Sequence, residues 1–316
     1  MALTFTDLKA EVASRVRLSV SATEQNTLLE RWINQSILDI HAREDWPWLL
    51  EREIVQTVAE KDDGTIAVSV GGTTVTGTST AFAAADVGKF IQTSDSEDWY
   101  KITAVASATS LTLEAAYTGS TALTAGTYII RKIFYTTSSS AEKILTIKQA
   151  RSPQKVWLIH YREWALNKPG LGDCTGKAEV YVIYGQDSSG NIRFSVYPHA
   201  DEIYNLEVLY KTRNIGTNAA DTALTTLSTG TDVPLIPGRY REVIINGALM
   251  RAYEYIRSDA GDRRPEMKAA VFERGIDQMK ADATRTSDRH IIIQNREGRL
   301  APQGPKLPED FDYRYR

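Results

Sequence analysis

The 316-residue chain is poor in the residues that disulfide formation, metal binding and catalysis require. Its one cysteine, Cys174, can form neither an intrachain disulfide nor a zinc knuckle. The four histidines stand far apart and none has the H-x-x-x-H spacing: His41, His160, His199 and His290. The sequence also has no G-x-S-x-G elbow, no P-loop and no G-x-G-x-x-G fingerprint. We therefore expect no enzyme, no metal site and no cofactor.

Long apolar runs and an excess of positive charge are missing as well. No segment approaches the roughly 20 apolar residues of a membrane-spanning helix, and the opening MALTFTDLKAEVASRVRL mixes charged with apolar residues. The formal net charge is −3, whereas nucleic-acid binders carry a basic excess or stripe. These features predict a soluble protein without a signal peptide.

The stretch from Gly64 to Arg131 is crowded with Thr, Ser, Ala, Gly and Val and contains no Pro, His or Cys. Short β-branched runs alternate in it with Gly, Ser and Asp turn signals, which is typical of a compact all-β unit. No base stands near its hydroxyl groups, so we interpret them as strand formers rather than nucleophiles. The pattern predicts a β domain, residues 62–133, inserted into a helical protein.

Helical periodicity flanks this insert on both sides. We expect a first helix capped by Thr6 and Asp7, and a second that starts at a capping box from Ser21 to Glu24. Pro265 fits the first position of a last helix. The apolar stripes of the four predicted helices are Phe5, Leu8, Val12 and Val16; Leu29, Ile33, Ile37 and Ile40; Ile244, Ala248, Ala252 and Ile256; and Phe272, Ile276, Met279 and Ala283.

Strand-like runs occupy the rest. They are predicted at Glu51–Val58, Lys155–Tyr161, Ala178–Tyr184, Ile192–Tyr197 and Tyr204–Thr212. We expect a short helix from the Ser138–Ser140 cap to Ala150, and one long loop from Asn214 to Asp232. The predicted fold class is therefore α+β: a helical bundle body built from the N- and C-terminal helices, with a small antiparallel sheet and an inserted all-β domain. The expected boundaries are 1–61, 62–133, 134–289 and 290–316.

Three tryptophans invite a functional interpretation. Trp46 and Trp48 flank Pro47 at the corner between a helix and a strand, and Trp164 follows Arg162 and Glu163. Because aromatic rings bury much area, we interpret all three as packing residues rather than as ligand platforms.

The final segment, 290–316, reads as an extended arm because Gly and Pro interrupt it and it has little to bury. Two interpretations remain open: a solvated end, or a segment that orders on a partner, since Tyr and Arg are frequent interface hot spots. The candidate contact residues are Arg285, Arg289, Arg296, Arg299, Phe311, Tyr313, Arg314, Tyr315 and Arg316.

The order and character of several segments resemble a known family, the head-to-tail adaptor proteins of tailed bacteriophages. In short-tailed phages these proteins are also called connectors or tail tubular protein A. The resemblance covers most of residues 1–290. The segments that carry it are Trp46–Trp48, Val87–Phe90, Trp99–Ile102, Ala116–Gly119, Phe194–Pro198, Tyr204–Tyr210 and Asp232–Pro237.

The resemblance implies a structural virion protein, assembled in the host cytoplasm, that forms a twelve-fold ring under the portal. Such a ring extends the DNA ejection channel, through which genomic DNA passes without sequence-specific binding, and offers an attachment surface for tail nozzle or tail fibre proteins. The resemblance also implies that the C-terminal arm reaches the portal. The β insert is longer than a minimal adaptor requires, and we expect it to face capsid or tail fibres.

Two other functions fit parts of the sequence. A tail-associated glycan-binding protein would use exposed aromatic and acidic residues of the insert, for which the candidates are Trp99, Tyr100, Tyr117, Tyr128, Asp95, Glu97 and Asp98. A tail-completion, or stopper, protein would act further from the portal.

Overall fold

The computed structural model describes residues 3–150, 155–167, 174–256 and 262–296, with residues 166–167 and 285–296 described by their backbone alone. The chain divides into two compact units, residues 1–49 with 214–316, and residues 50–213. The first, which we name the helical unit, is built from both ends of the chain. The second, the β unit, interrupts it in sequence.

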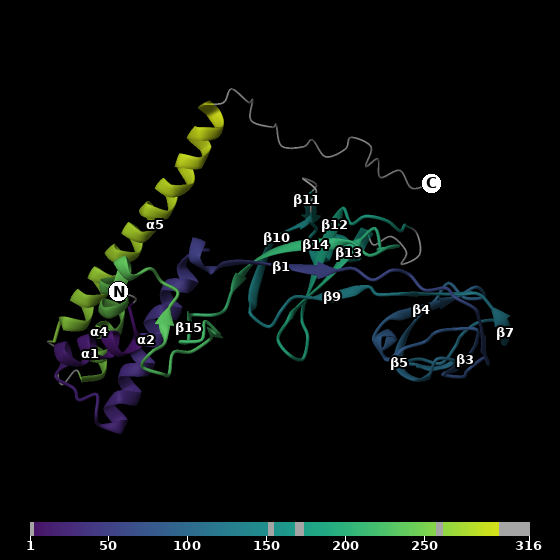
Figure 1. Cartoon of the computed structure of the whole chain (residues 1–316), viewed down its shortest axis with the longest axis horizontal. Helices are drawn as coiled ribbons and strands as arrows, with labels where there is room; N and C mark the ends of the chain where they lie inside the picture. Colours follow the sequence, from purple (N-terminus) through teal and green to yellow (C-terminus); the bar gives the residue numbers. More distant parts are fainter. Residues whose placement is uncertain (1–2, 151–154, 168–173, 257–261, 297–316) are drawn as a thin grey trace. The chain divides into compact units, whose positions relative to one another are not determined.

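Helix α4 (Arg241–Ile256) forms the centre of the helical unit. It packs against α1 (Phe5–Val16), α2 (Thr23–Arg43) and α5 (Arg264–Arg296). Figure 1 shows it alongside the first turns of the long helix α5. Every residue from Ile244 to Leu249 is buried, which is typical of a helix enclosed by neighbours on all sides.

The apolar stripes predicted from the sequence are confirmed at most positions. Fully or nearly fully buried members are Phe5, Leu8, Val12, Leu29, Ile33, Ile37, Ile40, Ile244, Ala248, Ala252, Phe272, Ile276 and Met279. Ile256, at the end of α4, is instead 38% exposed. The packing role of Trp46 is also confirmed, because its ring is buried, stacks on Trp48 at 5.0 Å and donates its N–H to the Ile40 carbonyl at 2.6 Å.

Both predicted helix starts were wrong in detail. Thr4, not Thr6 or Asp7, is the N-cap of α1, and it exchanges hydrogen bonds with Asp7 in a capping box. Helix α2 begins after Ala22, which makes no side-chain cap. The N-cap can therefore lie a few residues from its expected position when several neighbouring Ser, Thr and Asp side chains could each serve as the cap.

The segment Asn214–Asp232, predicted as one long loop, forms a small sheet together with Val233 and Pro234. Its strands, in the order β16-β15-β17, are β15 (Gly216–Thr217), β16 (Ala223–Leu224) and β17 (Val233–Pro234). Leu227, between the last two of these strands in sequence, belongs to the core of the helical unit. Strand pairing and the buried Leu227 side chain therefore fix this segment, although its composition is polar.

The first sheet of the β unit has seven strands in the order β1-β14-β10-β11-β12-β13-β9. Only β11 and β12 are parallel, and helix α3 (Tyr161–Asn167) connects them. The strands are β1 (Leu50–Gln56), β9 (Phe134–Thr136), β10 (Ala141–Gln149), β11 (Lys155–Leu158), β12 (Val180–Gln186), β13 (Ile192–Tyr197) and β14 (Asn205–Thr212).

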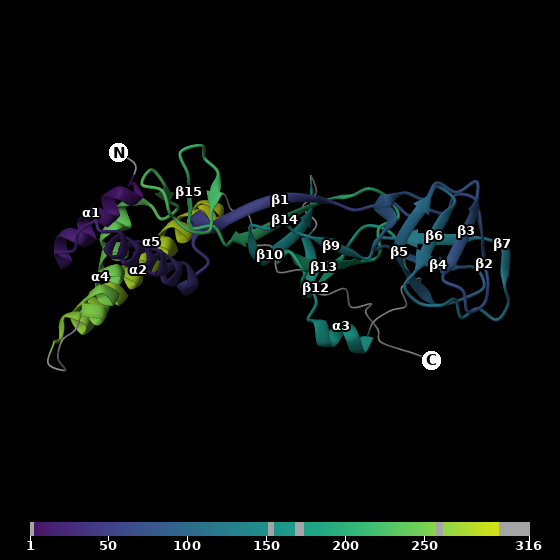
Figure 2. The same cartoon turned by 90° about the horizontal axis from the view of Figure 1, so that it is seen from below.

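The second sheet is built from the predicted insert and also has seven strands, all antiparallel, in the order β7-β2-β3-β6-β5-β4-β8. The strands are β2 (Thr65–Val68), β3 (Thr74–Thr78), β4 (Phe90–Thr93), β5 (Trp99–Ser107), β6 (Ser110–Leu113), β7 (Leu123–Gly126) and β8 (Tyr128–Arg131). Figure 2 shows these strands curling around their own core.

The two ends of the insert are fastened to each other. Lys61 and Ile130 form an antiparallel β-bridge. Next to this bridge, Arg131 donates a hydrogen bond of 2.5 Å to Glu60. The chain therefore leaves the first sheet and returns to it at neighbouring points.

The predicted fold class was wrong. The structure is mostly two curled, half-barrel sheets with a few helices, rather than a helical bundle with a small sheet. The Ser138–Ala150 segment, predicted as a helix, contains strand β10 (Ala141–Gln149), which lies between β14 and β11 in the sheet. Its buried residues Ala141, Ile144 and Ile147 recur every third position because two register shifts interrupt the alternation of the strand. This spacing imitates one face of a helix.

We predict that Gly247→Val destabilises the helical unit by about 1–3 kcal/mol through overpacking. A Cβ at Gly247 would lie 2.2 Å from Ser36 Oγ and 2.7 Å from a ring carbon of Phe272. Ser36 is itself fixed, because its hydroxyl donates to the Ile244 carbonyl at 2.8 Å. Denaturant unfolding followed by helical circular dichroism measures the effect. The matched change Ala270→Val on the exposed side of α5 should cost much less, and equal losses in both variants would contradict the prediction.

Candidate interaction surfaces

The predicted arm residues divide between helix α5 and the chain beyond it. Arg285, Arg289 and Arg296 lie in the last turns of α5, whose backbone continues to residue 296. Because about 3.6 residues complete a turn, these three positions fall on one side of the helix. The remaining candidates lie outside the described residues: Arg299, Phe311, Tyr313, Arg314, Tyr315 and Arg316.

The first half of α5 is fixed in the helical unit. Its apolar stripe joins the core, and three polar contacts secure its flanks. Glu273 pairs with Arg43 at 2.6 Å, Lys268 donates to the Asn246 side chain at 3.0 Å, and Asp282 accepts the Tyr240 hydroxyl at 3.2 Å. The first half of α5 is therefore held in place by both apolar packing and polar contacts.

Several large apolar side chains are exposed near the end of α4 and in the first turns of α5. Tyr255 is 66% exposed and Met267 67%, and Val271 and Ile256 are also exposed. Met267 and Val271 lie eighteen residues, or about five turns, before Arg285 and Arg289 on the same side of α5. Grouped exposed apolar side chains of this size mark interaction sites more often than isolated ones do.

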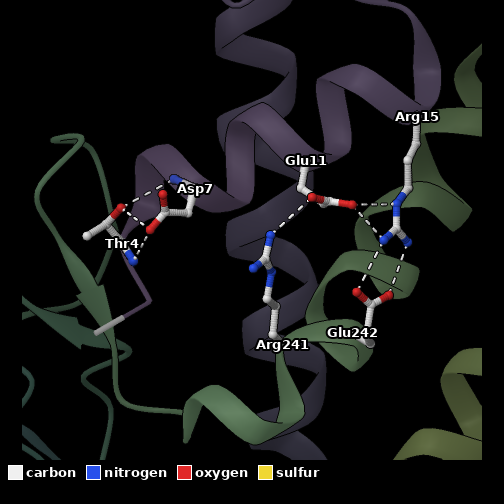
Figure 3. Close-up of polar contacts among 6 residues, drawn as sticks. All are labelled: Thr4, Asp7, Glu11, Arg15, Arg241 and Glu242. Atoms are coloured by element: carbon white, nitrogen blue, oxygen red, sulfur yellow. Dashed lines mark hydrogen bonds and ion pairs between the residues drawn. The ribbon is translucent and has the colours of Figure 1, made fainter. Parts of the chain in front are cut away.

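An ion-pair network joins α1 to the start of α4 (Figure 3). Arg15 pairs with Glu11 at 2.7 Å and with Glu242 at 3.1 Å, and Arg241 pairs with Glu11 at 3.1 Å. The hydrogen bond to Glu242 is the main reason why the pKa of Arg15 is raised. Partly exposed pairs of this kind contribute no more than about 1 kcal/mol each, so the network orients α1 rather than holding the fold together.

Buried polar groups hold the 214–236 segment on α1 and α2. The side chain of Asn34 donates to the Leu227 carbonyl at 2.9 Å and accepts the Leu227 N–H at 3.0 Å. The buried Asp232 accepts the N–H groups of Ser228 and Thr229, and its own carbonyl accepts the Phe5 N–H at 2.8 Å. Sequence reasoning missed both residues because their partners lie far away or in irregular backbone.

The β unit contains one notable cluster of rings. Phe90, Phe134, Trp164 and Tyr184 surround a cavity of about 110 Å³ whose lining also includes Ser195. Trp164 is 6% exposed, which confirms its packing role. The residues come from β4, β9, α3, β12 and β13, so no local sequence pattern could have predicted the cluster.

The insert surface does not match the glycan-binding alternative. Of the four candidate aromatic residues, Tyr100, Tyr117 and Tyr128 are buried in the core of the insert. Asp95 accepts hydrogen bonds from Tyr117 and Thr121, and is thus engaged within the insert. A sugar-stacking platform needs exposed rings, and of these four only Trp99 lies outside the buried set.

The remaining candidates for chemistry are dispersed. Cys174 is exposed, His160 is exposed, and His41 and His199 are buried in different units. The described part of the chain brings together no group of three His, Cys, Asp or Glu side chains that could hold a metal ion. Among the described helices, none is long and apolar enough to cross a membrane.

Comparison with known proteins bears on both units. A search of curated proteins found no match. The model of the family described as SU10 adaptor protein matches residues 3–293, nearly the whole chain. Such adaptors are structural, typically non-enzymatic components of the bacteriophage particle that associate with its capsid and tail proteins. The resemblance to phage head-to-tail adaptors is confirmed, and the chain belongs to the SU10 adaptor protein family.

Proposed function

We propose that this adaptor forms a ring beneath the portal, extends the DNA channel and presents an attachment surface for tail components. The family match over residues 3–293 carries the proposal. In the assembled virion the chain contacts further copies of itself, the portal protein, and tail nozzle or tail fibre proteins. The ring contains twelve copies, as the resemblance to head-to-tail adaptors implies.

A closed ring requires the same pair of unlike surfaces to meet at every subunit boundary. The exposed apolar side chains of Tyr255, Met267 and Val271 support such a contact, since a neighbouring subunit that covers them removes apolar surface from water. Native mass spectrometry of the protein with and without its portal measures the ring size directly. The free protein remains monomeric if the portal is needed as the template.

The net charge of −3 suits a conduit for DNA. Each phosphate that a protein neutralises adds to affinity, so a strongly basic channel would retain the genome during ejection. A mildly acidic subunit avoids this retention.

We further propose that the arm from Arg285 to Arg316 docks on the portal. Its Arg and Tyr residues are of the types that dominate interface energetics, and the helix from which it extends is fixed in the core of the helical unit. In this proposal the arm docks on the portal, and helix α5 connects it to the core of the helical unit.

Truncation after Arg296 should reduce attachment to portal-bearing capsids at least about tenfold, because several hot-spot side chains are lost together. Co-sedimentation with tailless capsids measures attachment. Among the described side chains of α5, Ala283 is the last that packs on the core, and the truncation keeps all of them, so we expect the truncated chain to unfold like the full chain.

A second variant separates the contribution of the arginines to portal attachment from that of the aromatic side chains. The triple variant Phe311→Ser, Tyr313→Ser and Tyr315→Ser removes three aromatic side chains but keeps every arginine of the arm. Attachment should fall here as well if the aromatic side chains fill portal pockets. Full attachment of the truncated chain would sink the assignment of the arm to the portal.

A further inference from the structure

The ring-lined cavity in the β unit has the walls of a binding site. Its four aromatic rings approach edge to face rather than in parallel stacks. Phe90 and Phe134 meet at 6.0 Å and 63°, and Phe134 and Tyr184 at 5.0 Å and 79°. Trp164 makes a similar contact with Tyr197 at 5.5 Å and 62°. Each ring is held by another ring, so the cavity is formed before any ligand arrives.

The polar groups at this cavity are few and uncharged apart from one histidine. None of its lining residues is Asp, Glu, Lys or Arg, and Ser195 and Tyr184 supply hydroxyl groups. Arg193 is outside the lining, but its guanidinium lies 4.9 Å from the centre of the Phe134 ring, and where burial raises the pKa of the Tyr184 hydroxyl the charge of Arg193 lowers it in part. A cationic ligand would therefore lose its hydration here without gaining a countercharge. The lining therefore favours an uncharged, mainly apolar group.

One buried donor lacks an acceptor. The ring N–H of Trp164 is buried and has no hydrogen-bond partner of normal geometry among the described residues. The Tyr184 hydroxyl is the acceptor that this N–H approaches, although the geometry of a normal hydrogen bond is not reached: burial raises the pKa of Tyr184, and the approach lowers it in part. A buried N–H without a partner is unfavourable, and a ligand oxygen placed beside it would remove that cost.

The size of the cavity limits the ligand to about one ring. A dry protein cavity of about 150 Å³ accepts benzene. The volume here is about 110 Å³, which suits a single ring that enters from the surface and is not wholly enclosed. Size, aromatic walls and the free N–H together describe a phenol group, whose ring packs edge to face and whose oxygen accepts from Trp164.

We propose that this cavity anchors one tyrosine side chain of a neighbouring virion protein. The identity of the neighbour rests on the proposed function, since an adaptor presents its surface to capsid and tail proteins. The chemistry of the anchor does not rest on it. Tyrosine is among the residues that most often fill such pockets at interfaces.

The test uses the full-length free protein and two probes, p-cresol for the tyrosine side chain and toluene for the same ring without its oxygen. Binding is followed by nuclear magnetic resonance of the probes' own signals, which can be read with the unaltered protein and with every variant. We expect p-cresol to bind about 2- to 10-fold more tightly than toluene, the effect of one added hydrogen bond. Trp164→Phe keeps a ring and removes the N–H, so the preference should disappear.

Trp48→Phe is the matched control. Trp48 also carries a buried ring N–H without a partner, but it lies in the helical unit and does not line the cavity. The preference for p-cresol should survive this change. Equal binding of the two probes to the unaltered protein, no binding of either, or an unchanged preference in Trp164→Phe would overturn the proposal. Because the free protein is used, loss of ring assembly or portal attachment leaves this result unaffected.

Discussion

Asn34→Leu should destabilise the helical unit by about 2–6 kcal/mol. The substitution removes both hydrogen bonds to the Leu227 backbone and leaves a buried N–H and a buried carbonyl without partners. Each such group costs about 1–3 kcal/mol. Denaturant unfolding at the helical circular dichroism band measures the loss, and hydrogen exchange of the Leu227 amide reports the broken contact directly.

Two variants on the same helix serve as controls. Asn34→Asp keeps an oxygen for the Leu227 N–H but brings a buried, unpaired carboxylate against the Leu227 carbonyl, so at neutral pH it should cost no less than the leucine variant. Arg31→Leu, at an exposed position of α2, should change stability by less than about 0.5 kcal/mol. If Arg31→Leu and Asn34→Leu lower the free energy of unfolding equally, the hydrogen bonds between Asn34 and the Leu227 backbone are not the cause of the loss.

Asp86→Ala should cost the insert about 3–5 kcal/mol, the usual effect of removing one partner from a buried ion pair. Asp86 follows β3 in the short helix η2 (Ala84–Asp86), and its side chain is 3% exposed. It pairs with Lys61 at 2.8 Å and with Lys89 at 2.7 Å. Without the carboxylate, two largely buried ammonium groups face each other. Proteolysis within residues 62–133 under native conditions measures the loss of local stability.

The same carboxylate makes the insert sensitive to acid. Burial tends to raise the pKa of Asp86, but hydrogen bonds from Lys61 and Lys89 outweigh it and hold the pKa below the ordinary value of 3.8. A lowered folded pKa means that its contribution is complete above the unfolded pKa and is lost as the pH falls through the folded pKa. Asp86→Asn should therefore flatten the decline in stability below about pH 4, whereas Asp62→Ala, at an exposed position, should leave it unchanged.

The amino-acid pattern predicts the helices of this protein better than its sheets. The stripe Leu29, Ile33, Ile37 lies on one continuous helix, so local periodicity is sufficient to find it. Strand β10 shows why a sheet is harder, because its register shifts space Ala141, Ile144 and Ile147 like helix residues. The size of each sheet depends on pairings between distant segments, such as β1 with β14, which no local window contains.

For the candidate sites, the sequence predicted Arg285 and Arg289 as residues of the arm, whereas their backbone lies in helix α5. The roles of Asn34 and Trp164 could not be predicted, because each depends on a partner or cavity wall from another part of the chain. The signals present in the sequence were a polar residue within an apolar helix stripe and a tryptophan beside charged residues.

The insert can tolerate changes in length because its two ends are joined by the Lys61–Ile130 bridge and the Glu60–Arg131 ion pair. A segment whose two ends meet closes its own loop, so the chain between them can lengthen or shorten at a cost that grows only slowly with its length. Changes in the length of residues 62–129 can therefore leave the two strands that flank the insert where they are in the first sheet.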